Sequence, residues 1–302
     1  MTASSTCIEV VLPGIAITVQ DAGRSGHRHE GMPLSGWLDA PLAHAANALV
    51  GNACNEAVLE MRGVGTEFRI QSEAVRVALA GTVTAKRWHP DGSCTAVSAW
   101  QTVTLQAGDR LSLGPVQSGC AYLAVAGGLL IPPQLGSRSS YWRAGLEGVL
   151  GRPWQPGDVL PCHAWLSDDA KEWRTTEWTH PAGPVRVLLG PQDDHFTSEA
   201  LHAFTQNSWE ATVEQDRMGM RLRGTTLQHI NAAAADIVSD AVTPGAIQVP
   251  ANGQPIVLLA DSQTVGGYPK IATVIAADLP KLAQARPGTR LQFQVINPAQ
   301  AQ

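Results

Sequence analysis

Short runs of β-branched and other apolar residues, separated by turns that contain glycine, recur along most of this chain. Between residues 57 and 125 they return about every ten residues, which is the spacing of strands in an antiparallel barrel or sandwich. No helical pattern alternates with them, so the doubly wound nucleotide-binding folds are a poor match. The strands predicted in this region are 57–60, 67–70, 75–80, 83–87, 103–105, 111–113 and 122–125.

The N-terminal region predicts strands at 8–12 and 15–20 on either side of a Pro-Gly turn. Residues 20–41 are rich in glycine and charge, which predicts a long, ordered loop of a kind that is often functional. Asp39 is then expected to cap a helix that ends at Gly51.

The stretch from residue 244 to 278 organises the second half of the chain. It predicts three strands, at 246–249, 256–259 and 271–276. The first connection between them contains Asn252-Gly253, a hairpin signal. The second, 261–270, is dense in hydrogen-bonding side chains and follows an apolar strand end, so the main candidate site is placed there.

Upstream of this stretch, Gly183-Pro184 suggests a division into domains 1–182 and 183–302. The second domain is expected to begin with a strand at 185–189 and a helix capped near Asp194. A strand at 211–214 and a closing strand at 290–295 complete the pattern.

Composition narrows the class of protein. A net charge of −5 without a strongly basic stretch argues against nucleic acid as a partner. The five cysteines are odd in number and lack C-x-x-C spacing, which is typical of reduced thiols in a cytoplasmic protein. No run of about 18 apolar residues and no signal-peptide pattern appear, so we expect no membrane association.

Familiar catalytic and nucleotide-binding motifs are missing from the sequence. It contains no G-x-x-x-x-G-K-[ST] loop, no complete G-x-G-x-x-G, no H-E-x-x-H and no G-x-S-x-G. His27 and His29 stand on the long N-terminal loop without nearby ligands in the sequence, so we expect no metal site.

Seven strings, in order along nearly the whole chain, resemble one family. They are TVQDAGR (18–24), ANALVGN (46–52), AGG (126–128), LGSRS (135–139), DRMG (216–219), GAIQVP (245–250) and QTVGGYPK (263–270). They are similar to the biotin-dependent carboxyltransferase family that includes allophanate hydrolase subunit 2, the KipA protein and the C subunit of 5-oxoprolinase. The resemblance implies a mainly β fold with two cyclophilin-like β-barrel domains and a few short helices.

The resemblance also implies an activity and partners. The leading hypothesis is the C subunit of an ATP-dependent 5-oxoprolinase, which acts with the B subunit (a KipI-like protein) and the A subunit to convert 5-oxo-L-proline to L-glutamate. ATP with Mg would act in the complex, and the chain would be active only there. The Met-Lys-Met biotinylation motif is missing, so no covalent biotin is expected on this chain. The alternatives are a carboxyltransferase subunit of a biotin-dependent urea-type carboxylase, or a KipA-like regulator that binds an inhibitor of a sensor kinase.

Amide substrates of this kind must be activated through phosphoryl or carboxyl intermediates, whose negative charge suits cationic side chains and backbone N–H groups. On that basis Lys270 and Arg217 are catalytic candidates. Asp261, as a proton acceptor or the ligand of a cation, and Tyr268, as a donor to a carbonyl or a stacking group, are the other two. The candidates for binding substrate or phosphate are Gln263, Thr264, Gly266, Gly267, Gln248, Arg221, Arg24, Asp21, Arg138 and Ser139.

Structural interpretations stand beside these functional ones. Asp216 and Arg217 are equally consistent with a salt bridge within a turn. Asp21 and Arg24 are equally consistent with residues that hold the long loop in place, an alternative called the pin interpretation below. Gln248, inside a strand, is also consistent with a polar group whose hydrogen bonds are satisfied locally.

Overall fold

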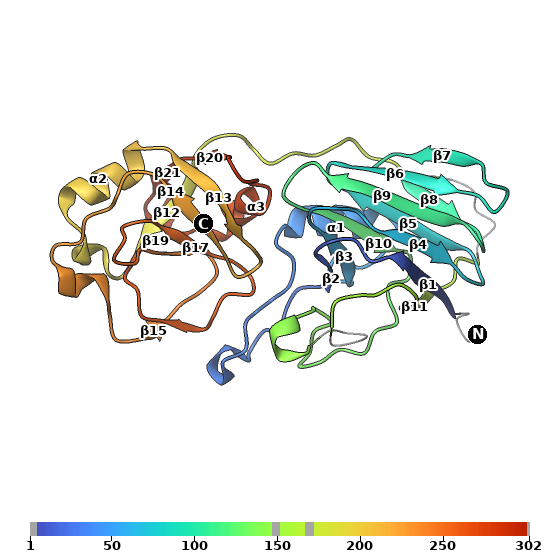
Figure 1. The fold of residues 1–302 in the computed structure, drawn as a ribbon, viewed down its shortest axis with the longest axis horizontal. Helices are drawn as coiled ribbons and strands as arrows, with labels where there is room; N and C mark the ends of the chain where they lie inside the picture. Colours follow the sequence, from blue (N-terminus) through green and yellow to red (C-terminus); the bar gives the residue numbers. More distant parts are fainter. Residues whose placement is uncertain (1–4, 147–151, 167–171, 301–302) are drawn as a thin grey trace. The chain divides into compact units, whose positions relative to one another are not determined.

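A computed structural model describes residues 5–146, 152–166 and 172–300, and the chain forms two compact units (Figure 1). Unit 1 comprises Met1–Arg24 and Ser35–Thr179; unit 2 comprises Ser25–Leu34 and His180–Gln302. Strands dominate both, which confirms the mainly β class. The predicted domains, 1–182 and 183–302, differ from these units chiefly in Ser25–Leu34, which packs with unit 2.

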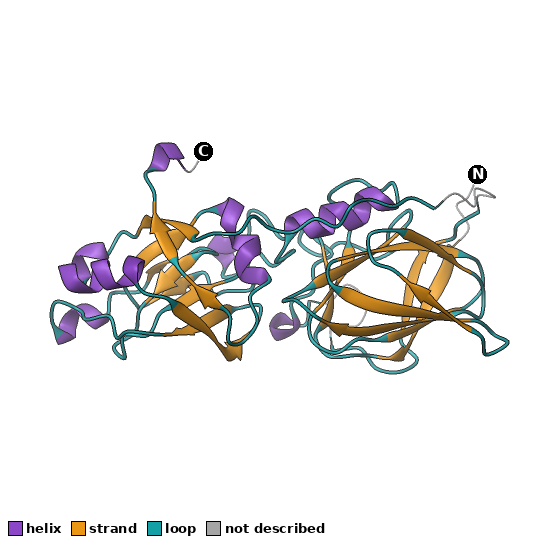
Figure 2. Ribbon diagram, turned by 90° about the horizontal axis from the view of Figure 1, so that it is seen from above, coloured by secondary structure: helices purple, strands orange, loops and turns teal. Residues whose placement is uncertain are grey.

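Unit 1 consists of two antiparallel sheets around one apolar core (Figure 2). The first has the order β11-β1-β4-β9-β6-β7: Val159–His163, Ser5–Leu12, Glu67–Ile70, Arg110–Val116, Val83–Trp88 and Cys94–Val97. The second has the order β2-β3-β10-β5-β8: Ile17–Gln20, Val58–Met61, Ala121–Val125, Val75–Ala80 and Thr102–Leu105.

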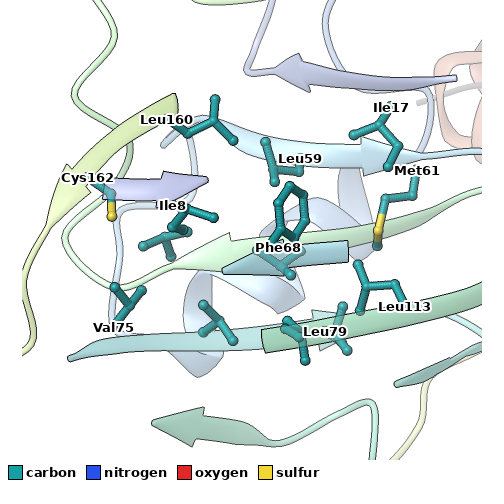
Figure 3. Close-up of a cluster of buried hydrophobic side chains, with 14 of the residues drawn as sticks. Ile8, Ile17, Leu59, Met61, Phe68, Val75, Leu79, Leu113, Leu160 and Cys162 are labelled. Carbon is teal, nitrogen blue, oxygen red and sulfur yellow. The ribbon is translucent and has the colours of Figure 1, made fainter. Parts of the chain in front are cut away.

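The core of unit 1 lies between its two sheets (Figure 3). Phe68 of the first sheet and Leu59, Met61 and Leu79 of the second are all buried in one cluster. Each fully buried side chain of this size contributes about 1.5–3 kcal/mol, so the apolar runs that predicted these strands also stabilise the unit by packing in this cluster.

Two strands of unit 1, β7 and β11, were not predicted from the sequence, and both lie at the edge of a sheet. β7 has three exposed residues out of four and pairs only with β6. β11 contains Pro161, which argues against a strand in sequence but is tolerated at an edge. Their pairing partners, and not their own composition, decide their conformation.

Unit 2 is built on one eight-stranded sheet with the order β20-β13-β14-β17-β16-β19-β12-β21. The strands are Arg290–Leu291, Trp209–Gln215, Gly219–Arg223, Ile256–Leu258, Ala246–Gln248, Lys270–Val274, Val185–Leu189 and Phe293–Val295. Because β20 and β21 are neighbouring parts of one C-terminal segment, that segment joins both ends of the sheet into a nearly closed barrel, as predicted for 290–295. The more specific cyclophilin-like topology stays a prediction.

A small ribbon interrupts the stretch predicted as a polar turn. β18 (Val265–Gly266) pairs with β15 (Asp240–Ala241), outside the main sheet. The ribbon brings residues 240–242 into contact with residues 264–266. The hydrophobic pattern of the sequence does not predict this contact.

Of the three α-helices in the described residues, α1 (Ala40–Leu49) begins as predicted, with the Asp39 side chain accepting from the Leu42 N–H. The prediction for α2 (Ser198–Gln206) was wrong at its start: Thr197 is the cap, and Asp194 lies in a preceding 3-10 turn. Thr197 has the extended backbone of an N-cap residue, which a position inside a 3-10 turn lacks. α3 is Leu279–Ala283, and within the described ranges no helix has the length and apolarity to cross a bilayer.

Candidate functional site

Unit 2 carries a pocket of about 490 Å³ beside the β13–β14 turn. Four residues proposed from sequence line it: Gln248, Gln263, Tyr268 and Arg221. The rest of the wall is Val213, Glu214, Gln215, Asp216, Met218, Gly219, Ile256 and Leu258. The strings GAIQVP and QTVGGYPK, which are separate in sequence, therefore meet at one cavity.

The β13–β14 turn is shaped by Asp216 and Gly219. Asp216 Oδ1 accepts from the backbone N–H groups of Met218 (2.7 Å) and Gly219 (3.2 Å). A Cβ at Gly219 would lie 2.9 Å from the Val257 carbonyl oxygen on β17, so only glycine lets the turn approach that strand. This close approach defines one wall of the pocket.

Arg217 and Asp261 form a bidentate ion pair next to the pocket. Arg217 Nε lies 2.9 Å from Asp261 Oδ2, and Nη2 lies 3.1 Å from Oδ1. The Asp261 N–H also donates to the Arg217 carbonyl oxygen. Because both of its carboxylate oxygens bind Arg217, Asp261 is placed to fix the turn. This favours the salt-bridge interpretation of Arg217, although its partner here is Asp261 and the sequence had suggested Asp216.

Lys270 joins the barrel to the ribbon. Its side chain is buried on β19, and Nζ donates to Asp240 Oδ2 (2.6 Å) and to the Ala241 carbonyl oxygen (3.1 Å) on β15. The hydrogen bond from Lys270 is the main cause of a lowered pKa at Asp240. Sequence analysis did not select Asp240, because it is a lone acid in no recognisable motif.

Arg28 holds the base of the ribbon from the N-terminal loop. Its Nη2 donates to the carbonyl oxygens of Val242 (2.5 Å) and Gln263 (3.4 Å), and the Val242 N–H donates to the Thr264 carbonyl oxygen. Burial of the Arg28 guanidinium lowers its pKa. Arg28 was also missed, because nothing in the sequence connects residue 28 with residue 263.

Of the two predicted glycines, Gly266 allows the ribbon to pack closely. A Cβ at Gly266 would lie 2.6 Å from Gln248 Nε2, and the Gly267 carbonyl oxygen accepts from the Ile237 N–H. Thr264, Gly266 and Gly267 are therefore placed to position Gln263 and Tyr268 and do not themselves line the pocket.

We expect Lys270→Met to loosen the ribbon, because methionine keeps the apolar stem but removes the charge that binds Asp240 and Ala241. Amide hydrogen exchange at Val242 and Ile237, whose N–H groups pair across the ribbon, should accelerate by roughly tenfold. The Ala126 amide of unit 1 is an internal control and should exchange at the wild-type rate. Unchanged exchange at Val242 would show that Lys270 does not hold the ribbon.

Asp21, Arg24, Arg138 and Ser139 form a separate cluster within unit 1. Asp21 accepts from the N–H groups of Arg138 (2.6 Å) and Gly23 (3.0 Å) and from the hydroxyls of Ser137 and Ser139. Burial raises its pKa, but these hydrogen bonds outweigh burial and leave the pKa lowered. Arg24 donates to the Ser139 carbonyl oxygen. The network favours the pin interpretation, and none of its residues lines the unit 2 pocket.

The pocket contains one cationic side chain, Arg221, which pairs with Glu214 at 2.8 Å, and a second carboxylate, Asp216. A triphosphate requires several cations or a glycine-rich cradle of N–H groups, so this wall fits a small polar ligand and does not fit ATP. Among the described residues no three His, Cys, Asp or Glu side chains gather as metal ligands would.

Comparisons with known proteins identify the family of the chain. Residues 30–295 match the family described as carboxyltransferase domain, subdomain A and B. The chain is 36% identical to the C subunit of 5-oxoprolinase from Escherichia coli strain K12 over 95% of this chain and 90% of that protein.

Two solved structures are similar over nearly all of this chain. A crystal structure of TTHA0988 matches with a TM-score of 0.80 and 34% identity over 96% of this chain. The K. lactis urea amidolyase matches with a TM-score of 0.86 and 27% identity over 98%. This chain spans 56% of the TTHA0988 chain and 19% of the urea amidolyase chain.

Proposed function

The chain belongs to the family of the carboxyltransferase domain, subdomain A and B, and from that premise we propose that it is the C subunit of an ATP-dependent 5-oxoprolinase. The observation that carries the proposal is the match to the C subunit of a 5-oxoprolinase over 90% of that protein's length. That match spans nearly the full length of the C subunit, whereas the urea amidolyase contains the same region as 19% of a longer chain.

The pocket supports a small amide substrate. Its volume of about 490 Å³ falls within the range of roughly 300–1,000 Å³ that is typical of small-molecule sites. 5-Oxoproline carries a five-membered lactam and a carboxylate. The side chains of Gln263 and Tyr268 offer donors and acceptors for the lactam, with Gln248 beside them. Arg221 would exchange Glu214, its partner at 2.8 Å, for the substrate carboxylate.

The reaction needs more than this pocket provides. Resonance makes the lactam carbon a weak electrophile, and phosphorylation of its oxygen by ATP would activate it toward water. The adduct would expel the ring nitrogen to give an acyl phosphate, and a second water would release phosphate and leave glutamate. Because the wall fits no triphosphate, we place ATP with Mg on a partner protein or at a site completed by assembly with the B and A subunits in the cytoplasm. This chain would bind and orient the lactam.

We expect 5-oxoproline-dependent ATP hydrolysis from this chain mixed with its candidate B and A subunits, and none when any one of the three is omitted. The measurement is phosphate release coupled to glutamate formation. A full mixture that assembles but stays inactive would refute the 5-oxoprolinase assignment and favour the KipA-like regulator.

A second function has its own support. Gln215 lines the pocket, and its buried Oε1 has no hydrogen-bond partner within the described part of the chain. That acceptor suits a ligand with several N–H groups, such as urea, and the urea amidolyase shares the fold. The alternative is therefore a carboxyltransferase that uses biotin carried by another protein. Carboxyl transfer from carboxybiotin to urea, measured with the same preparation, would support it.

A further inference from the structure

The pocket contains a chain of amide groups that ends at Gln263. Gln263 Nε2 donates to Gln248 Oε1 (3.3 Å), and Gln248 Nε2 donates to the Tyr268 carbonyl oxygen (3.3 Å). Gln248 is buried on β16, and its amide is engaged both as a donor, to Tyr268, and as an acceptor, from Gln263. The described residues supply no partner for Gln263 Oε1 or for its second N–H.

The backbone of Gln263 is also fixed. Arg28 donates to its carbonyl oxygen, and the Val242–Thr264 hydrogen bond closes the ribbon at the next residue. A half-buried glutamine held at its backbone and at one amide hydrogen loses little further freedom on binding. The remaining donor and acceptor of Gln263 therefore form a pre-positioned edge on the pocket wall.

A free primary-amide edge has a specific complement. Its C=O and the N–H beside it pair best with a group whose own N–H and C=O lie on the same side. Ordinary peptide groups are trans and place N–H and C=O on opposite sides. A five-membered lactam is cis because of its ring, and urea also presents both groups along one edge.

We propose that Gln263 is a specificity-determining residue, which binds the ligand by a two-point amide pairing and selects cis-amides over trans-amides and esters. The inference deepens the proposed function, on which it depends for 5-oxoproline as the ligand. Gln263 Oε1 accepts the lactam N–H, and Nε2 donates to the lactam C=O. Gln248 acts as a positioning residue that sets the rotation of the Gln263 amide.

The test compares 5-oxoproline with its lactone analogue, 5-oxotetrahydrofuran-2-carboxylate, which keeps the ring, the C=O and the carboxylate but lacks the N–H. Binding to the full chain assembled with its B and A subunits is measured by calorimetry. The wild-type complex should prefer the lactam by about 10- to 100-fold, the range expected when a polar group shielded by the bound ligand loses its partner.

Gln263→Leu should bring that preference to within about twofold, because neither half of the pairing remains. Gln263→Glu keeps the shape and the acceptor but not the donor, and should weaken lactam binding by about tenfold. Gln228→Leu, at an exposed position of unit 2 outside the pocket, should retain the wild-type preference. A structural defect at Gln263 would weaken both ligands equally.

Two outcomes separate this inference from the proposed function. In the first, 5-oxoproline is not turned over, but the complex binds urea and does not bind N,N,N′,N′-tetramethylurea, which lacks N–H groups, and Gln263→Leu removes that difference. The oxoprolinase assignment then fails, whereas the proposed pairing of Gln263 with cis-amides holds. If the wild-type complex distinguishes neither pair, or if Gln263→Leu leaves the preference intact, the inference is overturned.

Discussion

Replacing Asp21 with alanine should lower the free energy of unfolding by about 3 kcal/mol, the upper part of the range for a single substitution. The carboxylate is buried and accepts from two hydroxyls and two backbone N–H groups of residues 23 and 137–139. Alanine would leave these donors in an apolar environment, which costs about 1–3 kcal/mol for each group that finds no water. Urea denaturation of the full chain, followed by circular dichroism, measures the loss.

The pH dependence of Asp21→Asn provides a second readout. Because hydrogen bonds outweigh burial and hold the folded-state pKa of Asp21 below its ordinary value of 3.8, the stabilisation from its ionised form is present above that value. It is lost as the pH falls through the lower, folded-state pKa. The stability gap between wild type and Asp21→Asn should therefore be constant near neutrality and shrink in acid.

A substitution at an exposed position serves as the control for both Asp21 measurements. Glu177→Ala, at an exposed position of unit 1, should change stability by less than about 0.5 kcal/mol. If Asp21→Ala were as stable as this control but lost turnover, Asp21 would touch substrate, and the pin interpretation would fail.

Breaking the Arg217–Asp261 pair should cost a similar amount. Both side chains are largely buried, at 13% and 12% exposure, and removal of one partner of a buried pair typically costs about 3–5 kcal/mol. We expect about 3 kcal/mol for Asp261→Ala, because some exposure remains. Replacing both partners, as Arg217→Met with Asp261→Leu, should cost less than the sum of the single changes.

That double-mutant cycle also tests the catalytic role predicted for both residues. If the double variant regains both stability and turnover relative to the single variants, the pair is structural. A double variant as stable as the wild type and still inactive would show that Arg217 or Asp261 takes part in the chemistry.

The barrel-like fold could be predicted because its signal is local. Short apolar runs and glycine turns mark each strand independently, and a side chain such as Asp39 caps the helix that immediately follows it. β11 was missed because Pro161 carries the opposite local signal, and its partner β1 lies about 150 residues earlier in the chain.

The candidate site was predicted only in part, for the same reason. The polar strings of the second half led to Gln248, Gln263 and Tyr268, which do meet at one pocket. Their supports, Arg28 and Asp240, bind partners that no periodicity connects with them. Side-chain pairing across long sequence separations depends on tertiary structure, so a strand pattern does not reveal which of many lone charges will meet.

The membership of Ser25–Leu34 in unit 2 has a consequence for how the chain is made. The carbonyl groups that Arg28 binds lie 214 and 235 residues further along the chain. At a synthesis rate of about 5–20 residues per second, the ribosome needs roughly 10 to 40 s to add the 214 residues that separate Arg28 from the first of them. Until then this segment emerges without its docking surface, so unit 2 completes its fold only after its last strand, Phe293–Val295, has been made.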